Sequence, residues 1–341
     1  MNPIEVFEEV QKIIDPVFMV GGCVRDYILE REPHDYDFCT PLSPTEIEKR
    51  IRSCGRRPYL VGKKFGTVGV KIQDKNNIST FVEITTFRTE KYENGSRKPI
   101  VEFVPKIEQD LGRRDFTINA LAMKTSGKIL DFHGGKQDIK DRIIRCVGNP
   151  KHRFVEDPLR MLRAARFSSQ LDFIIDPDIS NTVKAINHKI LKISKERWVS
   201  ELDKMLISDK PRNGLEFLFE NRVMNFIIPE LSLQYNYKQD NPNHSHVLHE
   251  HTIRVVENVP KDINVRWAAL LHDIAKPFLR QYKENPTRCV YYKHELLGVE
   301  FIEKISRYLK WSNARTKLVS NMVLEHMKEG SVFKEADMDA K

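Results

Sequence analysis

The chain has 341 residues, enough for two or three domains with separate cores, and its 40% hydrophobic and 30% charged residues are typical of a soluble protein. It contains no apolar run near the ~20 residues that cross a bilayer, and its N-terminus has the pattern of an acidic amphipathic helix, which argues against a membrane protein and against a signal peptide. The net charge of +8 suggests a polyanionic partner, and five scattered cysteines without a C-x-x-C pair favour the reducing cytoplasm.

Strand and helix signals alternate over the first ~135 residues, an α/β or α+β pattern. We expect an α+β head with a mixed sheet over residues 1–150. Residues 88–99 form a polar, turn-rich segment, for which a surface loop between strands is the plain interpretation. Strands are expected at 17–20, 34–39, 58–62, 66–73, 79–87 and 128–132, and helices at 24–31, 44–54 and 115–124.

From about residue 152 the hydrophobic period becomes helical, apart from a short hairpin expected around 280–292. Breaks at Gly148–Pro150 and at 239–243 divide this part of the chain. We therefore expect an all-helical neck region at 151–240, followed by a second helical domain at 241–341.

The first chemical motif is a glycine turn followed by two carboxylates. A hydrophobic strand ends at Gly21-Gly22 and a helical stretch starts at Val24, an arrangement that aims backbone N–H groups at an anion. Asp35 and Asp37 alternate on an extended segment, so both point to one face. Adjacent carboxylates repel unless a cation lies between them, and oxygen ligands near phosphates favour Mg²⁺. A plain turn and a polar strand edge is the alternative.

Glu83 and Arg114 are candidates to join this site. Glu83 lies on the strand expected at 79–87, and three acids around two Mg²⁺ ions would activate a hydroxyl nucleophile, although an exposed edge position explains Glu83 nearly as well. Arg114 precedes Asp115, the expected N-cap of helix 115–124, and its guanidinium suits triphosphate oxygens. Asn119 on that helix could serve only as a backbone cap.

A third motif lies at 156–167, where one helix is expected to place Asp157, Arg160 and Arg163 along one side. An intrahelical salt bridge is the ordinary interpretation. The more specific interpretation is that these side chains select the base of the incoming nucleotide. The carboxylate would accept a hydrogen bond from the exocyclic amine of cytosine or adenine, and the arginine would donate one to the ring nitrogen. Arg166 points toward the apolar side of this helix.

These motifs, GGCVRD, DYD, RRDFTINAL and EDPLRMLRAARF, together resemble the class II tRNA nucleotidyltransferases (CCA-adding enzymes) and the related bacterial poly(A) polymerases over residues 15–170. The resemblance implies a polymerase-beta-like nucleotidyltransferase head in which Asp35 and Asp37 bind Mg²⁺. It also implies that Gly22, Arg25, Arg114, Asp157, Arg160, Arg163 and Arg166 contact the nucleotide.

The activity implied is template-independent transfer of CMP and AMP from CTP and ATP to the 3′ end of tRNA, with A-only addition or poly(A) synthesis as the alternative. Residues 86–99 resemble the flexible loop with which the family switches from C to A. Basic side chains that follow the base-reading motif suit RNA phosphates, although a solvated helix face is the ordinary reading of such a run. They are Lys184, Lys189, Lys192 and Lys195.

The last motif resembles an HD-type metal-hydrolase domain that holds a second divalent metal. Its candidate ligands are His251, His272, Asp273, His294 and His326. A helical scaffold without catalysis is the alternative. Rival functions for the whole chain are a metal phosphohydrolase with a nucleotide-sensing head, and a non-catalytic RNA-binding module. The family continues into further helices beyond the length of this chain, so we expect a shortened C-terminal region.

Overall fold

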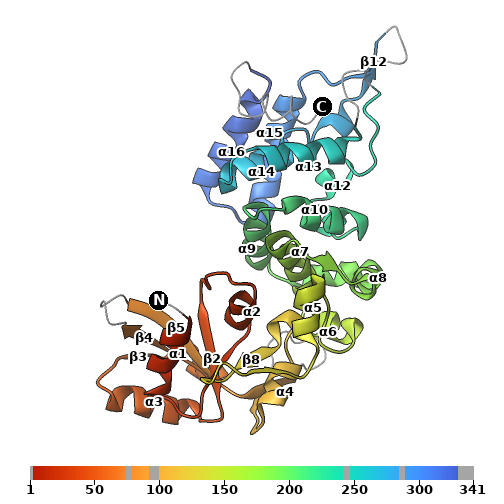
Figure 1. Ribbon diagram of the computed structural model, residues 1–341. Coiled ribbons are helices and arrows are strands. Elements are labelled where there is room, and N and C mark those ends of the chain that lie inside the picture. Colours follow the sequence, from red (N-terminus) through yellow and green to blue (C-terminus); the bar gives the residue numbers. More distant parts are fainter. Residues whose placement is uncertain (1–2, 74–78, 92–99, 241–245, 284–288, 329–341) are drawn as a thin grey trace. The chain divides into compact units, whose positions relative to one another are not determined.

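The computed structural model describes residues 3–73, 79–91, 100–240, 246–283 and 289–328 (Figure 1). The chain forms two compact units, Met1–Asp157 and Pro158–Lys341. The three-part division expected from the sequence stays a prediction. No helix in the described ranges is long and apolar enough to cross a membrane.

The first unit is built on a seven-stranded mixed sheet with the strand order β3-β4-β5-β2-β1-β8-β9. β2 and β5 pair in parallel, and the other strand pairs in this sheet are antiparallel. The strands are β1 (Phe18–Val20), β2 (Tyr36–Thr40), β3 (Pro58–Tyr59), β4 (Thr67–Gln73), β5 (Ser79–Thr86), β8 (Leu121–Met123) and β9 (Ile129–Asp131).

One face of this sheet is covered by helices (Figure 1). The ring of Phe7 on α1 packs edge-on against Phe38 of β2, with centroids 5.4 Å apart, and α3 buries Ile47 and Ile51. Ser43 and Glu46 form a capping box at the start of α3. The helices and 3-10 turns are α1 (Pro3–Gln11), α2 (Gly22–Ile28), α3 (Pro44–Ser53), η1 (Lys63–Phe65), α4 (Ile107–Gly112), η2 (Thr117–Asn119), α5 (Gly135–Asp141) and α6 (Pro150–Glu156), and β10 is Ile143–Ile144.

Two expectations for this unit are wrong. The helix expected at 115–124 is instead the turn η2 followed by strand β8, which lies between β1 and β9. Leu121, Ala122 and Met123 are all fully buried, and a short apolar run buried on both faces has no period that separates strand from helix. The loop expected from Arg88 begins as strand β6 (Arg88–Lys91), which pairs with β7 (Ile100–Phe103). Residues 92–99 lie outside the described ranges.

The second unit is almost entirely helical, and Trp198 and Trp267 are among its fully buried side chains. The hairpin expected at 280–292 is confirmed, with β12 (Gln281–Tyr282) paired to β13 (Cys289–Val290). The helices and turns are α7 (Arg160–Leu171), α8 (Pro177–Ile186), η3 (Asn187–Lys192), α9 (Lys195–Leu206), α10 (Pro211–Glu220), α11 (Met224–Ile227), α12 (Pro229–Ser232), α13 (Leu248–Asn258), α14 (Ile263–Leu271), η4 (Lys276–Phe278), α15 (His294–Leu309) and α16 (Asn313–Glu325), and β11 is Ile174–Ile175.

Candidate active site and metal centre

Strand register brings the predicted acids of the head together. In the parallel pair of β2 and β5, Asp37 lies directly opposite Glu83, so both side chains leave the same face of the sheet. Asp35 precedes Asp37 by two residues and is close enough to act on its charge. All three side chains are exposed, whereas Phe38 and Ile84 on the alternate positions are buried. We call Asp35, Asp37 and Glu83 the acid cluster.

The acid cluster concentrates negative charge. The carboxylate of Asp37 keeps solvent access but has protein on most sides, and this desolvation, together with the charges of Glu83 and Asp35, raises its pKa, while Arg114 acts in the opposite direction. Carboxylate oxygens that repel one another on an open face are a suitable donor set for a hard divalent cation. The donor chemistry of the acid cluster therefore suits a hard cation, although among the described residues the groups with ligand atoms all within 4.8 Å of one another are the two around Asp273.

The glycine turn beside β1 lies against two guanidinium groups. Gly21 has a φ of +81°, which glycine adopts without strain, and a Cβ on it would lie 2.8 Å from Nη1 of Arg114. A Cβ on Gly22 would lie 3.5 Å from Nη2 of Arg25. The absence of a side chain at Gly21 therefore lets the guanidinium of Arg114 lie against the turn, and a second guanidinium, that of Arg25, lies beside Gly22.

Both arginines are held in place by buried side chains. Arg25 donates from Nη1 to Oδ1 of Asn119 at 2.7 Å, and Asn119 donates from Nδ2 to Oδ1 of Asp115 at 3.3 Å. Arg114 donates from Nη2 to Oδ2 of Asp110 at 3.3 Å. Burial opposes charge on Asp110, but Arg114 and the adjacent arginine outweigh it and lower its pKa. Asn119 and Asp110 therefore position the two cations.

Sequence reasoning missed Asp110 and gave Asn119 too little weight. The spacing of Asp110 and Arg114, four residues apart on either side of the end of α4, was the available signal for the first pair. Asn119 reaches an arginine 94 residues away, and no local pattern shows this contact.

The base-reading motif does not form one helix. Asp157 has an extended backbone (φ −136°, ψ 99°) at the end of α6, and α7 begins only at Arg160. The reason is Pro158, which disfavours helical backbone in the preceding residue. Arg160 is buried in the first turn of α7, and the guanidinium of Arg163 lies 5.3 Å from the ring of Phe167.

Arg166 has a partner inside the second unit. Its Nε donates to Oε2 of Glu201 on α9 at 2.6 Å, and its guanidinium lies 4.0 Å from the ring centroid of Phe167. This buried pair joins α7 to α9. It gives Arg166 a structural role that needs no nucleotide.

The predicted HD-type ligands form one buried cluster, which we call the histidine cluster. Asp273 lies at its centre, and each of its two carboxylate oxygens faces two imidazoles. Oδ2 is 3.5 Å from His251 Nε2 and 3.1 Å from His272 Nε2. Oδ1 is 3.3 Å from His294 Nε2 and 3.8 Å from His326 Nε2. The cluster therefore consists of two potential metal-binding trios that share Asp273.

The imidazoles are oriented for metal binding by their other nitrogens. The Nδ1 atoms of His272, His294 and His326 each lie 2.6 to 2.8 Å from a backbone carbonyl oxygen, so these nitrogens donate and the Nε2 atoms face Asp273. Burial lowers the pKa of His326 to about 4 and so favours its neutral, ligating form. This donor set fits one or two divalent transition metals.

Lys276 also contacts this cluster. Its Nζ lies 2.6 Å from Oδ2 of Asp273. Burial opposes charge on Asp273, but His272 and Lys276 outweigh it and hold the pKa of the carboxyl well below its usual range. The carboxylate is therefore ionised and able to bind a metal at neutral pH.

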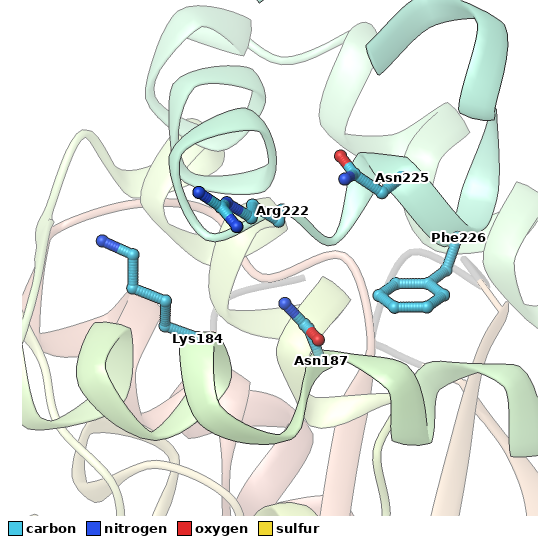
Figure 2. Close-up of a pocket in the computed structure, with 5 residues that line it drawn as sticks. All are labelled: Lys184, Asn187, Arg222, Asn225 and Phe226. Carbon is cyan, nitrogen blue, oxygen red and sulfur yellow. The ribbon is translucent and has the colours of Figure 1, made fainter. Parts of the chain in front are cut away.

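The four predicted RNA-binding lysines differ in their surroundings. The Nζ of Lys195 lies 3.4 Å from the ring centroid of Trp198 and donates to the hydroxyl of Tyr308 at 2.7 Å. Its ammonium group therefore already has partners within the protein. Lys189 and Lys192 lie on η3, where Lys192 is exposed. Lys184 lines a surface pocket of the second unit (Figure 2).

Comparison with known proteins identifies the family of the chain. Family models match the poly A polymerase head domain at residues 17–145, the probable RNA- and SrmB-binding site of polymerase A at 172–234, and the HD domain at 248–339. The CCA-adding enzyme of Staphylococcus epidermidis is 33% identical over 339 residues, which cover 92% of this chain and 80% of that protein. The chain belongs to the CCA-adding enzyme family.

Other members of the CCA-adding enzyme family match over different shares of their length. The enzyme of Bacillus subtilis is 41% identical over 207 residues, 60% of this chain and 50% of its own length. The crystal structure of the Bacillus stearothermophilus CCA-adding enzyme in complex with CTP has a TM-score of 0.64 at 28% identity and covers 100% of this chain and 82% of that chain. The expected family resemblance and the expected mixed-sheet head with a helical remainder are confirmed.

Proposed function

We propose that this chain is a template-independent tRNA nucleotidyltransferase that adds CMP and AMP from CTP and ATP to the 3′ end of tRNA. The observation that carries the proposal is the acid cluster of Asp35, Asp37 and Glu83 in the unit that also holds the Gly21–Gly22 turn and its two arginines. Relatives named CCA-adding enzyme support the choice of tRNA as acceptor.

In this mechanism the acid cluster would hold Mg²⁺, which would supply charge neutralisation and lower the pKa of the acceptor hydroxyl. The 3′ oxygen of the RNA forms a bond to the α-phosphorus, and the bond from that phosphorus to the leaving pyrophosphate breaks. The proton of the hydroxyl passes to solvent. The Gly22 backbone and the guanidinium groups of Arg25 and Arg114 bind the triphosphate, and Asn119 and Asp110 keep those guanidinium groups from turning away.

Base choice is assigned to Asp157, Arg160 and Arg163. The carboxylate of Asp157 would accept a hydrogen bond from the amine of cytosine or adenine, and an arginine would donate to the ring nitrogen. Guanine and uracil present a carbonyl at that position, which leaves the carboxylate unpaired. Residues 86–99, in part outside the described ranges, would adjust this site between CTP and ATP. We place the reaction in the cytoplasm, where the substrate tRNA is found.

The acid cluster provides the test of this proposal. In Asp37→Asn, nucleotide addition to tRNA should fall by at least about a thousand-fold because charge in the transition state is no longer neutralised. The fold should persist because the side chain is exposed and the substitution conserves its shape. Glu83→Gln should retain more activity than Asp37→Asn. Incorporation by Asp37→Asn at near wild-type rate in Mg²⁺ would overturn the assignment.

A second activity is supported by the histidine cluster. Two trios of buried ligands that share Asp273 suit a metal phosphohydrolase, which uses the metal to activate water and to polarise the phosphoryl group. We expect hydrolysis of phosphomonoesters or 2′,3′-cyclic phosphates in Mn²⁺, Ni²⁺ or Mg²⁺. Replacing both His272 and Asp273 by Ala should abolish it without reducing CTP incorporation. A wild-type protein that hydrolyses neither substrate class with any of these metals would show that the cluster is only a scaffold.

A further inference from the structure

A pocket of about 480 Å³ opens on the second unit where α8 and η3 approach the end of α10 and the start of α11. Figure 2 shows Lys184 and Arg222 toward one end, the ring of Phe226 at the other, and Asn187 between them. We propose that this pocket binds one nucleotide of the RNA acceptor, with its phosphate at the two cations and its base against Phe226. The proposal rests on the proposed function, which supplies the RNA.

The two cations are free to bind a phosphate. In the part of the chain that the structure describes, the side chains of Lys184 and Arg222 have no ion-pair or hydrogen-bond partner, whereas the side chain of Lys195 contacts Trp198 and Tyr308. Both side chains are exposed at the pocket. Two unneutralised cations on one side of a concave site attract a phosphodiester.

The other end of the pocket suits a base. Asn187 donates from Nδ2 to the carbonyl oxygen of Asn221 at 2.9 Å, which fixes the amide and leaves Oδ1 to accept from a base amine or a ribose hydroxyl. Asn225 adds a second amide beside Phe226 (Figure 2). An aromatic ring with amides at its edge matches the way proteins bind unpaired RNA bases, by stacking and by hydrogen bonds to the base edge.

The backbone at Arg222 points to a role for its side chain outside the fold. Arg222 follows Asn221, the C-cap of α10, and has a φ of +57°, a left-handed conformation in which glycine is favoured. A non-glycine residue there costs roughly 1 kcal/mol. The chain carries this cost at the position that places a guanidinium in the pocket.

RNA fits this site better than an isolated anion does. The pocket lies within residues 172–234, which match the family model for an RNA-binding site. Inorganic phosphate would use the cations alone, whereas the ring of Phe226 and the two amides need a base as well. A single-stranded nucleotide at the acceptor end supplies the phosphate, ribose and base together.

The strained backbone provides a sharp test. Arg222→Gly removes the cation and relieves the left-handed residue, so the melting temperature should stay the same or rise. The Kd of the full-length protein for tRNA that ends before CCA should nevertheless increase roughly three- to ten-fold, and the slope of log K against log salt should fall by about one. Lys184→Gln should act in the same way. Lys317→Gln, at an exposed lysine of α16, is the matched control and should change neither quantity.

The aromatic contact is tested separately. Phe226→Leu should weaken tRNA binding at every salt concentration without changing the slope of log K against log salt, because stacking is independent of counterion release. Phe226→Tyr, which keeps an aromatic ring, should bind tRNA as tightly as the wild type. A Kd and a slope unchanged in both Arg222→Gly and Lys184→Gln would overturn the inference. So would a loss of affinity for free CMP or inorganic phosphate with no change for tRNA.

The failure of this inference is distinguishable from the failure of the proposed function. If the wild-type protein extends tRNA and Arg222→Gly has the same KM for tRNA, only the pocket assignment fails. If the wild type adds no nucleotide, the proposed function itself fails. The expected result is a raised KM for tRNA with the kcat and the KM for CTP unchanged.

Discussion

Asp157 is the single residue on which base choice most depends in this account. In Asp157→Ala the acceptor for the amine of cytosine or adenine is lost, together with the penalty of ~1–3 kcal/mol that an unpaired carboxylate imposes on UTP and GTP. Discrimination against UTP and GTP should therefore fall roughly ten- to a hundred-fold. The rate with CTP should fall too, because correct pairing positions the α-phosphate. Single-nucleotide incorporation of all four NTPs measures both effects.

Glu156→Ala is the matched control for this experiment. Glu156 is the neighbouring acid, and its carboxylate pairs with Arg153 at 3.1 Å, so its loss should leave base selection unchanged. If UTP and GTP stay as strongly excluded by Asp157→Ala as by the wild type, Asp157 is structural and another residue reads the base.

Residues on the acid cluster were predictable because they follow local rules. Asp37 and Glu83 leave the same face because both lie on extended strands that pair in register, whereas Asp35 lies in a bend before β2 and not in a strand as expected. The contacts that hold the arginines were not predictable. Arg166 contacts Glu201, 35 residues further along the chain, and Arg25 contacts Asn119, 94 residues further along. At such sequence separations only the tertiary fold determines which residues are partners.

At the scale of elements, the strands of the sheet were largely predictable and the exceptions have two physical causes. Strand β8 has no alternation because both of its faces are buried, so its sequence also suits a helix. The expectation of a single helix at 156–167 did not take account of Pro158, whose ring disfavours a helical backbone at the residue before it. In both places a rule of burial or backbone geometry overrode the side-chain pattern.

Helix α10 approaches α7 so closely that Gly214 has no room for a side chain. A Cβ there would lie 2.5 Å from Oγ of Ser169 and 2.7 Å from the carbonyl oxygen of Ala165. Gly214→Ala should therefore lower the free energy of unfolding by ~1–3 kcal/mol, as measured by urea denaturation. Gly298→Ala on α15 is the control, because the nearest atom to its added Cβ would be a methyl of Val323 at 3.3 Å, a contact that a shift of a few tenths of an ångström relieves. Equal stability of the two variants would contradict the close packing of α10.

Helices α10 and α13 are joined by an ion-pair network centred on Arg212, whose Nη1 lies 2.8 Å from Oε2 of Glu250. Burial opposes charge on Glu250, but hydrogen bonds from Arg212 and Arg254 outweigh it and lower its pKa to about 2. A depressed carboxyl pKa stabilises the fold above the unfolded pKa of ~4.3, and this stability is lost as the pH falls toward 2.

Glu250→Gln should therefore destabilise the protein at pH 7 by up to about 1 kcal/mol, a modest amount because the pair is partly exposed. The difference from the wild type should shrink as the pH falls below about 4. Urea denaturation at pH 7, 4 and 3 measures it, with Glu220→Gln at an exposed position of α10 as control. A difference that is constant over this range would show that the network contributes no charge-dependent stability.

For the whole molecule, the order of the motifs predicted a nucleotidyltransferase head followed by helices and an HD domain, and this is confirmed by the family models at 17–145, 172–234 and 248–339. The sequence could not predict that Asp273 would lie between two histidine pairs. Its ligands come from α13, from the residues just after α14, and from the N-terminus of α15 and the end of α16, so only the packed helices assemble them.

The most direct test of the central claim uses tRNA that ends before CCA, with CTP alone, ATP alone or both, and products sized to one nucleotide. We predict that CTP alone adds two residues and that CTP and ATP together add three. ATP alone should add none, because the two C residues must be added before the site accepts ATP. Addition of A only to tRNA that already ends in CC, or long tails from ATP alone, would contradict CCA addition and identify an A-adding enzyme or a poly(A) polymerase.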